Sequence, residues 1–152
     1  MMEGYDVEIF EGLAAIPHFN PDLDHDPAPE AVALLRQKIT EANAVLICTP
    51  EYVFSLPGSL KNALEWMVST VVFSEKPVGL ITASASGKKG HAQLKMVMKT
   101  LGAKFTPKTC LLISSIKAKM GATGEIVDEK TRQEVEQFTV SLDRVLKRKG
   151  AE

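Results

Sequence analysis

Residues 44–66 read AVLICTPEYVFSLPGSLKNALEW, and this stretch decides the fold. Its first part, Ala44 to Cys48, is a continuous apolar run with β-branched members, which favours a strand covered on both faces, as in a parallel sheet. Pro50 ends the strand because proline has no N–H to donate to a ladder. Pro57 and Gly58 then suit the start of a helix. The stretch therefore predicts a strand, an exposed loop and a helix.

The helix that follows the loop has its apolar residues at helical spacing. They are Leu60, Ala63, Leu64 and Met67. The loop is thus held between the carboxyl end of a strand and the amino end of a helix. Ligands of open α/β sheets bind at this place, and a helix amino end favours an anion or an electron-rich group.

The loop and the helix also follow a specific sequence pattern. It consists of Thr49-Pro50-Glu51-Tyr52, then Ser55, then Pro57-Gly58, then Leu60-Lys61-Asn62-Ala63-Leu64-Glu65-Trp66. This pattern resembles the signature of NAD(P)H-dependent FMN reductases, approximately TPEYNGSIPGxLKNALDW. The chain departs from it at Val53 and Phe54, where the family usually carries Asn-Gly. Residues 16–23, IPHFNPDL, likewise resemble the family's LPxFNPDL connection.

The resemblance covers nearly the whole chain and implies one flavodoxin-like domain over residues 1–152, a three-layer α/β/α fold with a parallel sheet. It begins at the family's second strand, and no residue matches the family's first strand, first helix and Gly-Ser-x-Arg phosphate loop. We therefore expect this chain by itself to bind FMN weakly or not at all. In the strand order 2-1-3-4-5 the first strand is central. Without a first strand, a gap one strand wide would separate residues 7–10 from residues 44–48. Either the outer strand closes this gap, or another chain fills it, or the region is loose.

Hydrophobic periodicity predicts the remaining elements. Strands are predicted at Tyr5–Phe10, Pro77–Thr82 and Thr109–Ile113, and helices at Pro29–Glu41, His91–Leu101 and Asp128–Arg148. Strands that alternate with helices indicate βαβ units and a parallel sheet. The length of 152 residues suits one domain with a sizeable core.

Composition excludes some classes of partner. The formal net charge is -1, so no basic field exists to hold nucleic acid or an anionic membrane. No apolar run approaches the ~18 residues of a membrane span and no signal peptide opens the chain, so we expect a cytoplasmic protein. Cys48 and Cys110 lie in apolar, strand-like runs and are expected to be buried, reduced thiols.

The family resemblance implies a cofactor site on two turns. In the family the first turn borders the isoalloxazine ring through backbone groups and the tyrosine ring, which makes Pro50, Glu51, Tyr52 and Val53 candidates. The alternative for Tyr52 is packing against a partner subunit.

A second candidate turn follows the strand that ends at Thr82. It offers Ser84, Ser86 and Gly87, because small residues let a backbone approach a ring or a phosphate. The turn resembles the family's Ser-x-Gly-Gly turn loosely, and an ordinary strand-to-helix connection is the alternative. Lys88 and Lys89 either attract the phosphates of a nicotinamide cofactor or are simply solvated.

Other chemistry finds little support. Asp22-x-Asp24-x-Asp26, near His18 and His25, copies the first ligand positions of a calcium loop, yet proline and alanine stand where that loop needs glycine and glutamate. We therefore expect no metal site. No G-x-S-x-G elbow is present, so a hydrolase triad is not expected either.

The resemblance implies an NAD(P)H-dependent flavin or quinone reductase that uses FMN and passes hydride to a small acceptor. Free flavin, a quinone, an azo dye and a metal oxyanion all remain open as that acceptor. No catalytic side chain is expected, because the flavin carries the chemistry. The alternative is a non-catalytic flavodoxin-like oligomeric module that has lost flavin binding. The resemblance also implies a homodimer or homotetramer, for which we expect Trp66 and Phe54 to be apolar anchors.

Overall fold

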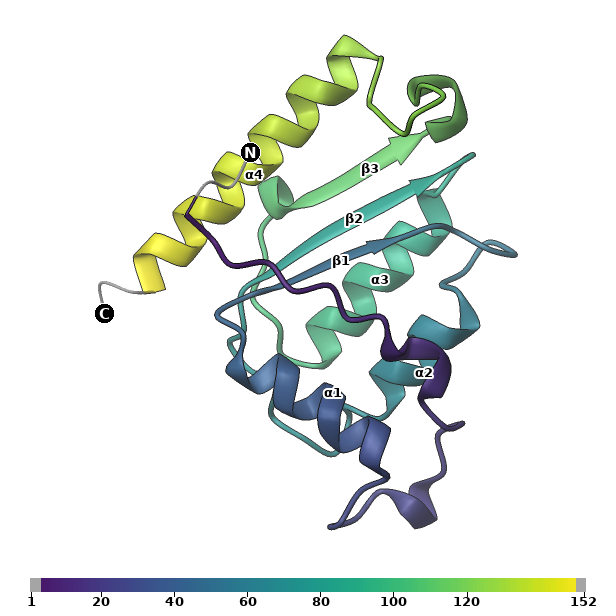
Figure 1. Cartoon of the computed structure of the whole chain (residues 1–152), viewed down its shortest axis with the longest axis vertical. Coiled ribbons are helices and arrows are strands. Elements are labelled where there is room, and N and C mark those ends of the chain that lie inside the picture. The colour runs from purple at the N-terminus through teal and green to yellow at the C-terminus, as the bar shows by residue number, and fades with distance from the viewer. Residues whose placement is uncertain (1–3, 150–152) are drawn as a thin grey trace.

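Three parallel strands form the sheet in the computed structural model, which describes residues 4–149. They are β1 (Val45–Thr49), β2 (Val78–Ser84) and β3 (Cys110–Ser114), in the spatial order β1-β2-β3. Ile47 of β1 lies opposite Leu80 of β2, and Leu80 lies opposite Cys110 of β3. Because the strands are parallel, their carboxyl ends meet at one edge of the sheet (Figure 1).

Four helices flank the sheet, which confirms the three-layer α/β/α fold. They are α1 (Glu30–Glu41), α2 (Gly58–Glu65), α3 (Lys88–Thr100) and α4 (Glu129–Lys149). Leu80 belongs to the core cluster that contains residues of α1, α2 and α3. Gly79, the preceding residue of β2, faces α4, since a Cβ there would lie 2.8 Å from the Phe138 ring. Successive residues of a strand point to opposite faces, so α4 covers the face opposite the main core.

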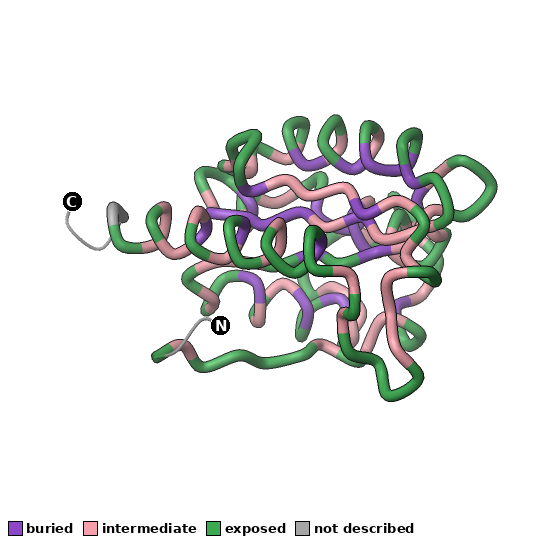
Figure 2. The backbone as a smooth tube through the Cα atoms, turned by 90° about the horizontal axis from the view of Figure 1, so that it is seen from above, coloured by how far each residue is buried: buried purple, intermediate pink, exposed green. Residues whose placement is uncertain are grey.

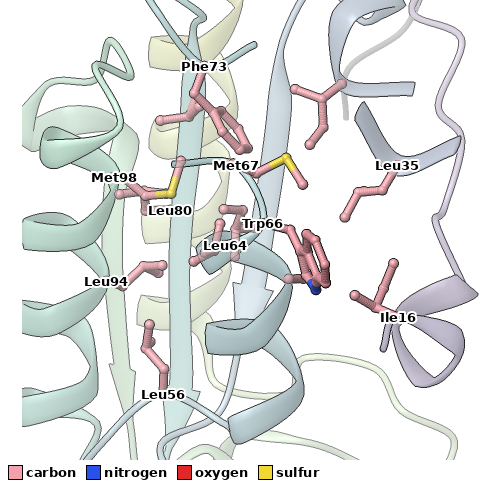
Figure 3. Packing of buried hydrophobic residues seen from close by; sticks show 14 of the residues in the cluster. Ile16, Leu35, Leu56, Leu64, Trp66, Met67, Phe73, Leu80, Leu94 and Met98 are labelled. Carbon is pink, nitrogen blue, oxygen red and sulfur yellow. The ribbon is translucent and has the colours of Figure 1, made fainter. Parts of the chain in front are cut away.

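The main core lies between the sheet and helices α1 to α3 (Figure 3). Its fully buried large side chains include Trp66, Met67, Leu80, Leu94 and Met98.

Trp66 occupies the part of this core beneath residues 16–19. Its exposed fraction is 0% and its Nε1–H donates to the Pro17 carbonyl at 2.8 Å. The Phe19 ring meets the indole edge-on, with ring centroids 5.1 Å apart. The expectation that Trp66 is an interface anchor is therefore wrong, because the loop before α1 covers it and satisfies its only donor.

Residues 5–10 do not form the strand predicted from their alternating pattern, and that prediction is wrong. The Tyr5 hydroxyl donates to Asp143 of α4 at 2.7 Å, and Glu8 pairs with Lys38 of α1. Val7 is 70% exposed. Figure 2 shows this stretch as exposed along most of its length. An alternating pattern produces a strand only where the stretch pairs with a neighbouring strand. Within residues 4–149 the outer edge of β1 is unpaired, and residues 5–10 bond to α4 and α1 instead of to that edge. The described sheet therefore has three strands instead of four.

β1 is buried on one face only. Ile47 and Thr49 are buried, whereas Leu46 is 52% exposed and Cys48 is exposed. The prediction of a strand covered on both faces is wrong, as is the prediction of a buried Cys48 thiol, because the core lies on the Ile47 side of the strand and the opposite face is left open. Cys110 is partly buried.

The other elements match their predictions with small shifts at the ends. α3 begins at Lys88, three residues before the predicted His91, because the preceding Gly87 adopts a φ of 78° and turns the chain into the helix. Gly102, with a φ of 78°, follows the end of α3 as expected. Across residues 4–149, none of the helices has the length and apolar character needed to cross a membrane.

Candidate functional site

The loop after β1 closes in a two-residue turn. The Tyr52 N–H donates to the Ser55 carbonyl at 3.0 Å, and the Ser55 N–H donates back to the Tyr52 carbonyl at 2.9 Å. Val53 and Phe54 between them have φ values of 50° and 56°. Positive φ at both central residues defines a type I′ turn, which favours Asn-Gly.

This turn keeps its conformation without the residues that favour it. A β-branched residue such as Val53 is rarely found at positive φ, because its Cβ crowds the following carbonyl. The side chains also gain little from packing, since Val53 is 95% exposed and Phe54 is 72% exposed. The turn therefore stores backbone strain at the carboxyl edge of the sheet, where strained residues tend to serve binding.

Glu51 ties this loop to the turn after β2. Its Oε1 accepts from the Gly87 N–H at 3.0 Å and its Oε2 accepts from the Gly90 N–H at 2.7 Å. The Ser84 hydroxyl donates to the Glu51 carbonyl at 3.3 Å. We call the two carboxylate bonds, to Gly87 and Gly90, the Glu51 clamp. The clamp holds the two candidate turns side by side.

The Glu51 carboxylate is the anion at the amino end of α3. The hydrogen bond from the Gly90 N–H lowers the pKa of Glu51, the bonds from Gly87 and Lys89 lower it further, and partial burial opposes them. Negative charge is favourable at a helix amino end. This end of α3 is therefore already bonded to a carboxylate of the chain itself, and Lys88 and Lys89 are exposed beside it.

Both glycines of the clamp stand where a side chain would be too close to its neighbours. A Cβ on Gly90 would lie 3.2 Å from both the Glu51 Cβ and the Ser55 carbonyl oxygen. Gly87 has a φ of 78°, and a Cβ there would lie 2.7 Å from Leu112. The sequence placed Gly90 in the second candidate turn, residues 84–90, but did not predict its bond to Glu51. The available signal was a pair of glycines one helical turn apart after a strand, Gly87-Lys-Lys-Gly90.

Two further bonds fix the candidate turns. The Ser55 hydroxyl donates to the Gln93 side chain at 2.6 Å, and the Ser114 hydroxyl at the end of β3 donates to the Ser86 carbonyl at 2.7 Å. Gln93 was not predicted from the sequence, because no pattern connects it to Ser55.

The structure thus brings all the predicted cofactor residues to one edge of the sheet. They are Pro50, Glu51, Tyr52 and Val53 on the first turn, and Ser84, Ser86 and Gly87 on the second. The clamp turns the Glu51 carboxylate toward α3. The exposed residues of the set are Tyr52, which is 62% exposed, Val53, which is 95% exposed, and Ser86, whereas Ser84 is partly buried and Gly87 is buried. Asp24, from the calcium-like run, pairs with Arg36 at 2.7 Å.

These residues fit the ring part of a flavin. An exposed aromatic ring, backbone groups and small side chains at strand ends can border a flat ring system. The same residues do not offer a phosphate site, because the amino end of α3 is already bonded to Glu51.

Comparison with known proteins agrees with this geometry. The sequence pattern of the family described as NADPH-dependent FMN reductase matches residues 1–118. An NAD(P)H-dependent FMN reductase of Pseudomonas aeruginosa is 33% identical over 145 residues, which cover 91% of this chain and 77% of that protein. An NADPH:quinone oxidoreductase of Arabidopsis thaliana is 32% identical over 145 residues, covering 91% of this chain and 74% of that protein.

A solved structure shows the same fold. The flavoenzyme FerB, an NAD(P)H:(acceptor) oxidoreductase from Paracoccus denitrificans, superposes with a TM-score of 0.72 at 28% identity, covering 90% of this chain and 78% of that one. The flavodoxin-like architecture and the resemblance to the family are confirmed by these comparisons. The chain belongs to the NADPH-dependent FMN reductase family.

Proposed function

We propose that this chain is an NAD(P)H-dependent oxidoreductase that uses FMN to reduce a small acceptor such as a quinone. Family membership supports FMN and NAD(P)H as the cofactors. The observation that carries the proposal is the Glu51 clamp, which joins the two candidate turns at the carboxyl edge of the sheet, where ligands of open α/β sheets bind. The alternative of a non-catalytic module is not favoured by the relatives, which are named as reductases.

Bound FMN would supply the hydride and electron chemistry. The protein's part is to bind and orient it. Tyr52 and the backbone of Pro50 and Val53 would border one part of the ring, and Ser84, Ser86 and Gly87 would border another. Glu51 would act as a positioning residue that holds the two turns in fixed positions relative to each other.

Steady-state kinetics test the proposal directly. NADPH oxidation is followed in the presence of a simple quinone while FMN is titrated. We expect a rate that saturates with FMN and depends on the quinone. The same titration, followed by quenching of flavin fluorescence, measures the dissociation constant of FMN independently of turnover. An absence of FMN-dependent NADPH oxidation at FMN concentrations that saturate the fluorescence signal would favour the non-catalytic module.

The oligomeric state is a separate part of the proposal. We infer a homodimer or homotetramer from the exposed apolar turn, in which Val53 is 95% and Phe54 is 72% exposed. Trp66, being buried, takes no part. Sedimentation of the chain and of Phe54→Ser tests this inference, and a clean monomer of the unmodified chain at micromolar concentration contradicts it. The use of NAD(P)H fits a cytoplasmic location.

A further inference from the structure

A cavity lies between α3 and the start of β3, apart from the two turns of the candidate site. Its volume is about 240 Å³. It is lined by His91, Lys95, Phe105, Thr106, Pro107 and Cys110. None of these residues belongs to the turns at residues 50–55 and 84–87, so the cavity is separate from the proposed cofactor site.

His91 carries an unused hydrogen-bonding group into this cavity. The side chain is only 7% exposed, and its Nδ1 lies 3.0 Å from the hydroxyl oxygen of Thr82 in β2. Thr82 is fully buried, and within residues 4–149 its hydroxyl has no other acceptor in reach. The hydroxyl therefore donates to Nδ1, which places the imidazole proton on Nε2.

The Nε2–H group has no hydrogen-bond partner among the described residues, although His91 lines the cavity. Among the described residues, the fully buried side-chain nitrogen or oxygen atom without a hydrogen-bond partner is Arg36 Nε. The His91 Nε2–H group is therefore open to solvent at the cavity, where it can donate to a ligand with an acceptor atom.

Lys95 makes the cavity positive. It lies four residues after His91 on the same helix, so the two side chains share one face of α3. In the part of the chain that the structure describes, Lys95 forms no ion pair, and no aspartate or glutamate lines the cavity. The remaining walls are mainly apolar, from Phe105, Pro107 and Cys110. His91 and Cys110 offer two metal-binding side chains only, too few to hold a metal ion.

We propose that this cavity binds a small monocarboxylate with a compact apolar body. The carboxylate would accept from the His91 Nε2–H and from the Lys95 ammonium, and the apolar body would lie against Phe105, Pro107 and Cys110. A cavity of ~150 Å³ is known to hold benzene, so the larger space here has room for one ring and a carboxylate. Charge-assisted hydrogen bonds would bind the carboxylate, and the apolar walls would bind the rest of the ligand, so a site of this kind favours such an anion.

Benzoate is the probe, and the protein is the full 152-residue chain without FMN or NADPH. Amide chemical shifts are followed by NMR as benzoate is added. We expect saturable shifts at His91, Lys95 and residues 105–110, with little change at residues 50–55. Benzamide has the same shape without the charge and should bind about tenfold more weakly or worse.

Matched variants identify the residues responsible. Lys95→Met should weaken benzoate binding about tenfold, because it removes the ammonium and keeps the chain length. Lys99→Met removes a lysine one turn further along α3, outside the cavity, and should leave the affinity unchanged. His91→Gln, checked for folding by circular dichroism, should weaken binding as well. Lys95 is exposed, so its variant decides the question even if His91→Gln unfolds.

Four results would each overturn the proposal. They are the absence of saturable shifts, equal affinity for benzamide and benzoate, unchanged affinity in Lys95→Met, and shifts confined to residues 50–55. The measurement uses no cofactor and no turnover, so its outcome is independent of whether the chain reduces quinones.

Discussion

The Glu51 carboxylate accepts a 2.7 Å hydrogen bond from the backbone N–H of Gly90, which lies 39 residues further along the chain. This bond connects the loop after β1 to the first turn of α3. Glu51 was predicted as a residue that borders the cofactor. The structure gives its side chain a positioning contact, with the carboxylate bonded to the amino end of α3, and the predicted role of its backbone stays a prediction.

Replacing Glu51 should loosen the two turns without unfolding the domain. In Glu51→Gln the side chain keeps one acceptor oxygen but loses the charge, and its amide N–H₂ would face a backbone donor. We expect faster hydrogen exchange at the amides of Gly90 and Gly87, measured by NMR. Glu65→Gln, which alters only the surface pair with Lys61, is the control and should leave these amides unchanged. Equal exchange in both variants would contradict the clamp.

Acid should weaken the clamp in a defined direction. The folded-state pKa of Glu51 is lowered from the ordinary 4.5, so the unfolded chain binds this proton more readily. The stabilisation is therefore fully present above the ordinary pKa and is lost as pH falls below it through the folded pKa. We expect the unmodified chain to lose stability relative to Glu51→Gln as the pH falls below 4.5.

Urea unfolding of the two proteins over a pH series measures this difference. The pKa values of Asp24, Asp128 and Asp143 are lowered as well, but these groups are common to both proteins and cancel in the comparison. A stability difference that stays constant with pH would show that the Glu51 carboxylate is not coupled to folding.

The strained turn should respond to a residue suited to it. Val53→Asn replaces a β-branched side chain at a φ of 50° by a residue that tolerates this region. We expect the free energy of unfolding to rise by about 1 kcal/mol, since left-handed backbone costs roughly 1–2 kcal/mol per residue. Val71→Asn is the matched control, because Val71 is also exposed, at 81%, and lies outside the positive-φ residues. An equal effect of both changes would mean that strain is not the cause.

Much of the fold could be predicted because its signals are local. The apolar runs at β1, β2 and β3 and the stripes of α1, α3 and α4 each depend on neighbours in sequence. The errors arose where the outcome depends on distant residues. Tyr5–Phe10 alternates like a strand, but among the described residues it bonds to α4 and α1 instead of to the edge of β1. Trp66 directly follows α2 and is covered by residues 16–19.

In the candidate site, too, the features set by local sequence were predicted and those set by distant contacts were not. The seven predicted cofactor residues, from Pro50 to Gly87, do lie at one edge, because strand ends can be read from local pattern. The function of the Glu51 carboxylate could not be read, since it depends on Gly87 and Gly90 after the next strand. The type I′ conformation of the turn could not be predicted from the sequence either, because Val53 and Phe54 are residues that disfavour positive φ.

Asn62 offers a test of how the loop before α1 is held over Trp66. Its Oδ1 accepts from the Phe19 N–H at 2.8 Å and its Nδ2 donates to the Pro17 carbonyl at 2.9 Å. Asn62→Asp keeps the shape but turns the donor into an acceptor facing a carbonyl. We expect a loss of about 1–3 kcal/mol in unfolding free energy, measured by urea unfolding.

Asn20→Asp is the matched control for this change. Asn20 uses only its Oδ1, which accepts from the Asp22 N–H at 3.0 Å, so an aspartate keeps the contact. Equal destabilisation by both substitutions would show that added charge, and not the lost donor of Asn62, is responsible.

Tyr52 provides the most direct test of the proposed cofactor site. Its ring is 62% exposed, so Tyr52→Ala should leave the unfolding transition nearly unchanged. If the ring borders the flavin, the variant loses an aromatic contact of about 0.5–1.5 kcal/mol, and the dissociation constant of FMN should rise up to about tenfold. Fluorescence quenching of FMN measures it. Tyr5→Ala removes a tyrosine that bonds Asp143 of α4, away from the strand ends, and should leave FMN affinity as it is. If Tyr52→Ala also leaves it unchanged, the ring does not border the flavin, and Tyr52 is then better explained as a contact between subunits.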